Sequence, residues 1–150
     1  MLTDLFLAIL HHLAIVSLIA MLAFESALLR PGITSQNLSR VTRVDAGYGM
    51  TAGLVIVIGV CRVIWGIKGA DFYLSNPWFW AKMASFAGIG LLSIPPTLAL
   101  LKWRKQSRSD PAFLPADADI KRLRGFIQAE VGLLLLVVTF AAMMARYGGF

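Results

Sequence analysis

Long apolar runs alternate with short polar stretches along the chain, and this pattern predicts the fold. Four segments are apolar over about 20 residues, the length that a helix needs to cross the hydrocarbon core of a bilayer. They span approximately residues 5–29, 46–67, 78–101 and 126–145. The longest stretch between them, residues 102–125, carries two prolines and is typical of a surface loop. We therefore expect an all-α, integral membrane, four-helix transmembrane bundle that forms a single transmembrane domain over residues 1–150.

Composition supports a lipid environment, and the positions of the charges predict an orientation. Hydrophobic residues make up 58% of the chain and charged residues only 15%, so a water-soluble domain of this size could not bury the apolar surface. The basic residues gather in two of the three stretches between segments: Arg40, Arg43, Lys102, Arg104, Lys105, Arg108, Lys121, Arg122 and Arg124. The positive-inside rule places these stretches in the cytoplasm and both termini outside. We expect a multi-pass protein of the bacterial inner membrane that contacts the lipid bilayer and no nucleic acid.

This orientation converts position in the sequence into depth, and it brings five basic side chains to one level. At 1.5 Å per residue, all of them fall in the outer third of the membrane. They are His11 and His12 in the first segment, Arg62 in the second, Lys82 in the third and Arg146 at the end of the fourth. Ionisable residues inside a membrane are costly and usually functional, so these are candidate site residues. For Lys82 the alternative is that it extends to the headgroups beside an interfacial belt of tryptophans.

Three acidic residues form a second level near the cytoplasmic side. Glu25, Asp45 and Glu130 lie at heights similar to those of Arg30, Arg43 and Arg124. One interpretation is that they form ion pairs that lock the helix ends, and the other is that they relay protons. His11 and Glu25 are 14 residues apart, which is close to four full helical turns, so they share a face of the first helix. Two costly side chains on one face indicate that this face points into the bundle.

The outer basic level suits an anionic cofactor in an apolar setting. It offers imidazoles and cations without a neighbouring acid, a set that is poor for a metal hydrolase or a Ser–His–Asp triad. Haem b fits, with His11 or His12 as the metal ligand to iron and with Arg62, Lys82 and Arg146 binding the propionates.

Three stretches also resemble a known family. They are HHLAIVSLIAMLAFESALLR, GLVIVIGVCRVIWGIKGADFYLSNPWFWAKMASF and AAMMARYGG. Together they resemble a family of four-helix bacterial inner-membrane proteins with a domain of unknown function. More distantly, they are similar to HemJ-type protoporphyrinogen IX oxidases and to CopD-like membrane proteins.

The HemJ resemblance implies that haem b is bound and that a histidine and a lysine take part in function. By motif, these roles pass to His11 or His12 and to Lys82 as the catalytic residue, with Arg62 beside them. The HemJ-type run has a histidine between its tryptophan and lysine, whereas this chain has Phe79, Trp80 and Ala81 between Trp78 and Lys82. The resemblance therefore supports the fold more strongly than it supports the activity.

These observations predict a haem b-binding membrane oxidoreductase, with a tetrapyrrole or a quinone as a partner molecule. Two alternatives stay open: a non-enzymatic accessory or assembly subunit, and a copper or proton transport protein that uses Glu25 and Glu130. We also expect a homo-oligomer or a subunit of a larger membrane complex.

Overall fold

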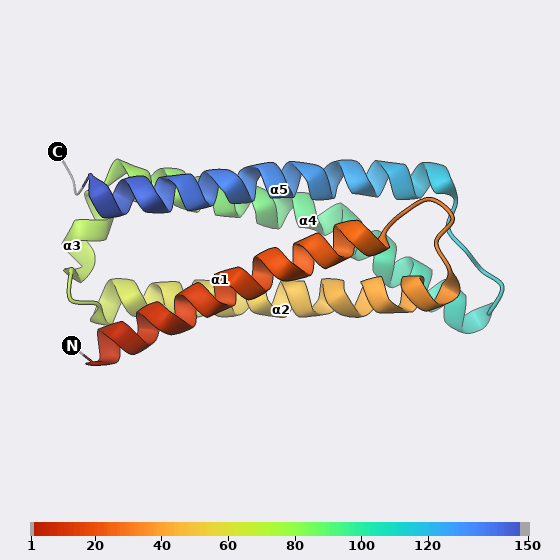
Figure 1. The fold of residues 1–150 in the computed structure, drawn as a ribbon, viewed down its shortest axis with the longest axis horizontal. Coiled ribbons are helices and arrows are strands. Elements are labelled where there is room, and N and C mark those ends of the chain that lie inside the picture. The colour runs from red at the N-terminus through yellow and green to blue at the C-terminus, as the bar shows by residue number, and fades with distance from the viewer. Residues whose placement is uncertain (1, 148–150) are drawn as a thin grey trace.

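The computed structural model describes residues 2–147, and most of them lie in five helices (Figure 1). The helices are α1 (Leu2–Leu28), α2 (Ser35–Trp65), α3 (Gly69–Leu74), α4 (Pro77–Ser109) and α5 (Asp117–Arg146). All except the short α3 are long and apolar enough to cross a membrane. The predicted all-α architecture with four transmembrane helices is confirmed.

The helices extend well beyond the apolar segments that predicted them. Helix α2 begins at Ser35 rather than near residue 46, and α4 continues to Ser109 rather than ending near residue 101. The expected loop over residues 102–125 was wrong for most of its length, because only residues 110–116 lie between α4 and α5. Hydropathy marks where the chain enters lipid, whereas lysine, arginine and glutamine continue a helix readily outside it.

Local sequence signals explain where several helices begin. Thr34 precedes α2, and its hydroxyl accepts a hydrogen bond of 3.2 Å from the amide of Asn37. Asn76 precedes α4 in the same way, accepting a 2.9 Å bond from the amide of Trp78, and Pro77 occupies the first helical position. These side chains satisfy amide groups that have no partner within the helix.

The turn between α1 and α2 is fastened to α5. Gly32 has a φ of +75°, a conformation that other residues rarely adopt. Its amide donates a 2.9 Å hydrogen bond to Asp117 in the first turn of α5. This contact joins two of the segments that meet at one end of the bundle.

The long helices form two antiparallel pairs, in which α1 packs chiefly against α2 and α4 against α5. We call the end with both chain termini and α3 the terminal end, and the opposite end, with residues 29–34 and 110–116, the loop end. In Figure 1 the two pairs lie apart at the terminal end, and α1 and α4 cross toward the opposite pair as they approach the loop end. The two pairs are therefore not in equally close contact along their length.

The buried residues follow the same gradient. The larger apolar core draws on all four long helices and includes Leu22, Leu38, Leu100, Trp103 and Ile127. The smaller cluster, toward the terminal end, consists of Ala14, Val55 and Ile58 on α1 and α2. Many leucine, isoleucine and valine side chains on the outer faces are exposed, as expected for helices surrounded by lipid.

Candidate functional site

The first polar group lies toward the terminal end, where the two helix pairs are apart. His11 on α1, Arg62 on α2 and Lys82 on α4 are each half-buried, and we call them the basic layer. The imidazole of His11 lies near the positively charged groups of Arg62 and Lys82. The structure thus brings together three of the five basic residues that the sequence singled out, from three different helices.

His11 is positioned by the buried face of α1 and by a glycine on α2. It lies one turn before Ala14, which begins the stripe of buried residues that ends at Glu25. A Cβ atom added to Gly59 would lie 3.4 Å from Cε1 of His11, so the ring packs directly over this glycine. A side chain larger than that of alanine at Gly59 would therefore compete with the imidazole for this space between α1 and α2.

Unpartnered polar atoms are concentrated in and beside the basic layer. Among the described residues, the buried side-chain nitrogens without a hydrogen-bond partner are His11 Nδ1, Arg62 Nε and Trp78 Nε1. Trp78 precedes Lys82 by four residues and therefore shares its face of α4. Buried polar atoms without a partner are rare in native proteins, and a ligand or water that completes their bonds is a common explanation.

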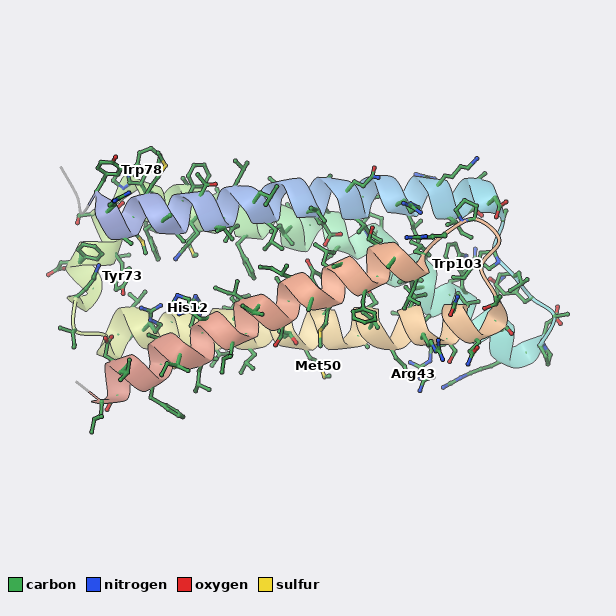
Figure 2. The ribbon with its side chains drawn as sticks, in the orientation of Figure 1. His12, Arg43, Met50, Tyr73, Trp78 and Trp103 are labelled. Atoms are coloured by element: carbon green, nitrogen blue, oxygen red, sulfur yellow. The ribbon has the colours of Figure 1, made fainter. Side chains whose placement is uncertain are left out.

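His12, next to His11 in the chain, and Arg146 differ from the basic layer in being exposed. His12 is exposed, and its Nδ1 lies 2.6 Å from the carbonyl oxygen of Ala8 on the same helix. Arg146 is exposed in the last turn of α5. Figure 2 shows His12 and Trp78 toward the same end of the bundle, on α1 and α4. Of the two histidines, only His11 combines burial with a free ring nitrogen.

Several aromatic rings lie near the start of α4, and one of them is beside Lys82. Its Nζ lies 5.4 Å from the centre of the Phe79 ring, which also contacts Tyr73 of α3. Trp78 stacks on Phe140 of α5, with ring centres 6.0 Å apart. Trp80 is exposed, and its indole nitrogen donates to the carbonyl of Leu74. The basic layer therefore has aromatic walls on the α3–α4 side.

The second polar group is acidic and lies deep in the bundle. Glu25 of α1, Asp45 of α2 and Glu130 of α5 expose only 2%, 6% and 1% of their surface, and we call them the acid cluster. Glu25 lies near both Asp45 and Glu130. Each acid belongs to the buried stripe of its own helix, so the fold of the chain brings the three together.

Two hydroxyl groups bind the acid cluster from neighbouring helices. Tyr48 on α2 donates a 2.9 Å hydrogen bond to Oε2 of Glu130, and Thr97 on α4 donates a 2.8 Å bond to Oδ1 of Asp45. All four long helices therefore contribute to this centre. Sequence reasoning missed both hydroxyls as partners. The spacing of three residues between Asp45 and Tyr48 placed them on one face, but no pattern pointed to Thr97.

The arginines that the sequence suggested as partners for the acids make other contacts. Arg43 donates to the carbonyl and the hydroxyl of Ser39 within its own helix. Arg124 donates a 3.4 Å bond to the carbonyl of Leu29. Within residues 2–147, hydroxyl donors are the hydrogen-bond partners that the structure gives to Asp45 and Glu130.

An apolar stretch separates the two polar groups. Ala14, Leu18 and Leu22, all buried, lie on α1 between His11 and Glu25. Fourteen residues of helix correspond to about 20 Å along the axis. Among residues 2–147, no group of three His, Cys, Asp or Glu side chains is arranged to hold a metal ion. The basic layer and the acid cluster are two distinct candidate sites.

Comparison with known proteins places the chain in a family. It belongs to the family described as predicted membrane protein (DUF2214), whose model matches residues 3–149. No curated protein matches the chain significantly. No solved structure does so either. The family match agrees with four membrane-spanning helices, and the similarity to HemJ-type and CopD-like proteins stays a prediction.

Proposed function

We propose that this member of the family is a haem b-binding oxidoreductase of the bacterial inner membrane, with the cofactor bound at the basic layer. The observation that carries the proposal is the concentration of unpartnered buried nitrogens at His11, Arg62 and Trp78. An imidazole nitrogen without a partner is available to a metal, and two nearby cations suit an anionic group.

Each residue of the basic layer has a role in this proposal. His11 would ligate the iron, while Arg62 and Lys82 would bind the two propionates or the carboxylates of a tetrapyrrole substrate. When bound, haem would supply one-electron chemistry at its iron. Lys82 is the proposed catalytic residue, because its ammonium can hold an anionic substrate or a quinone oxygen beside the cofactor. His12 and Arg146 are not needed for binding.

A spectrum of the purified protein tests the proposal. The chain, expressed with ample haem supply and purified in detergent, should show a Soret band and near-stoichiometric haem b in a pyridine haemochrome assay. His11→Ala should remove this absorbance, and His12→Ala, the matched control on the adjacent residue, should keep it. Haem retained when both histidines are replaced would exclude the assignment. A colourless protein that copurifies with a larger membrane complex would instead support an accessory or assembly subunit.

A second candidate, proton transport, is favoured by the acid cluster. Three carboxyl groups and two hydroxyl groups meet in the interior of the bundle, a typical composition for a proton relay in membrane proteins. Leu18 and Leu22 lie between this cluster and His11. A proton could cross this apolar stretch only if the helix pairs moved and admitted water.

Proton uptake into vesicles tests this second candidate. In liposomes with an internal pH-sensitive dye, a proton transporter should acidify the lumen under an imposed potential, and Glu25→Gln should slow this at least tenfold. Asp119→Asn, an exposed carboxyl in the first turn of α5, is the control. If liposomes with and without the protein acidified at equal rates, proton transport would be excluded.

A further inference from the structure

A cavity of about 410 Å³ lies at the loop end, between α2 and α4. Ligand-binding pockets in proteins commonly have volumes of a few hundred cubic ångströms. Residues of α2 and α4 line it: Leu38, Ser39, Thr42, Arg43, Arg104, Ser107 and Arg108. None of them belongs to the basic layer or to the acid cluster.

The lining combines three arginines with three hydroxyl groups and contains no carboxylate. Arg43 holds its place through bonds of 3.3 Å from Nε and Nη2 to the carbonyl and hydroxyl of Ser39, which leaves its other N–H donors free. Arg104 is half-buried on the facing helix. Guanidinium groups form paired hydrogen bonds with phosphate oxygens. The hydroxyls of Thr42 and Ser107 already donate to the carbonyls of Ser39 and Arg104, which leaves the hydroxyl of Ser39 as a further donor. This set of side chains matches a phosphate group.

The height of the cavity fits the polar boundary of a bilayer. Its residues on α2 precede the apolar run that begins near residue 46, and those on α4 follow the run that ends near residue 101. In Figure 2 Arg43 lies toward the loop end, close to the start of α2. Basic pockets between transmembrane helices at this level bind the headgroups of anionic lipids.

We infer that this cavity is a binding site for a phosphate group, held by Arg43 and Arg104 across the two helices, with Arg108 and Ser107 at its rim. The phosphate comes either from the headgroup of an anionic phospholipid or from a soluble phosphate compound. Because α2 and α4 belong to different helix pairs, a bound phosphate also joins the two pairs at the loop end. The site is independent of haem binding and of proton transport.

Binding measurements on the full chain test the inference and distinguish the two sources. One arm counts phosphatidylglycerol retained by the detergent-purified protein, using native mass spectrometry. The competitor is zwitterionic phosphatidylcholine, in which choline balances the charge of the phosphate. The other arm measures the shift in melting temperature caused by inorganic phosphate or pyrophosphate, compared with chloride at equal ionic strength. Arg104→Gln and Arg43→Gln should each lower the affinity for the lipid or phosphate probe about tenfold, as expected for loss of a charged hydrogen bond.

Arg40→Gln is the matched control, because Arg40 is an exposed arginine of the same helix outside the cavity. It should change binding by no more than about twofold. Ser39→Ala, which keeps every charge but removes the hydroxyl that holds Arg43, should also weaken binding and guards against a general charge effect. Selective retention of phosphatidylglycerol supports a lipid ligand, and a shift with soluble phosphate alone supports a soluble one. Equal losses in Arg40→Gln and the cavity variants, or no binding of either probe, would overturn the inference.

Discussion

The hydroxyl of Tyr48 donates a 2.9 Å hydrogen bond to Oε2 of Glu130, and this bond joins α2 of one helix pair to α5 of the other. Both side chains are almost fully buried. The bond from Thr97 to Asp45 likewise joins α4 to α2. The acid cluster is thus a polar connection between the two helix pairs in the interior of the bundle.

Removal of the tyrosine hydroxyl should weaken the contact between the pairs. We expect Tyr48→Phe to lower the free energy of unfolding by about 1 kcal/mol, a typical value for an interhelical hydrogen bond in a membrane. The measurement is SDS-induced unfolding in mixed micelles, with Tyr147→Phe, at an exposed tyrosine, as the control. If the bond matters, Tyr48→Phe and Glu130→Leu together should cost less than the sum of the two single changes. Additive costs would show that the two groups do not interact.

Thr97 should make a similar contribution through Asp45. Thr97→Val keeps the shape of the side chain but leaves Oδ1 of Asp45 without this donor, so we expect a loss of about 1 kcal/mol in the same unfolding assay. Thr139→Val is a suitable comparison, because Thr139 is exposed and its hydroxyl bonds only to its own helix, at Leu135. A larger effect at Thr139 than at Thr97 would contradict a structural role for the acid cluster.

Two glycines on α4 should respond in opposite directions to the same change. A Cβ at Gly88 would lie 3.0 Å from Cδ1 of Leu133, whereas one at Gly90 would meet nothing within 4 Å. Gly88→Ala should therefore destabilise the contact of α4 with α5 by about 1 kcal/mol. Gly90→Ala should raise stability by about 0.5–1 kcal/mol, because alanine favours a helix more than glycine does. Identical melting temperatures for the two variants would show that α4 and α5 are not this closely packed.

The size of the residue at position 59 should control haem binding at the basic layer. Gly59→Leu would displace the ring of His11, which packs over this glycine, and we expect at least a tenfold loss of bound haem with helical content unchanged. Gly53→Leu serves as the control, because no atom lies within 4 Å of a Cβ there. Circular dichroism checks the fold of both variants, and haem content provides the readout. Unchanged haem content in Gly59→Leu would show that His11 does not bind the cofactor.

Orientation in the membrane can be tested by labelling introduced cysteines. In a Cys61→Ala background, Ala70→Cys on α3 should react in intact spheroplasts with a maleimide that cannot cross membranes. Ala112→Cys, between α4 and α5, should react only after the membrane is opened. Both native side chains are exposed, so access within the protein should be similar. The reverse result would place the basic loop end outside, against the positive-inside rule.

The sequence by itself determined the helical class, the four membrane-spanning segments and the shared face of His11 and Glu25. These properties depend on hydropathy and on helical periodicity, which are local. The chief errors of the prediction from sequence concerned helix ends, because polar residues such as Arg104 and Lys121 continue helices beyond the apolar region.

Only the tertiary structure decided which polar groups meet. The depth of a residue follows from its position along one helix, but its partner depends on how the helices rotate and cross. That is why Glu25, Asp45 and Glu130 were expected beside arginines and instead lie beside one another, with hydroxyl groups from Tyr48 and Thr97. The rotation is set by packing of the whole buried face of each helix, which no short motif records.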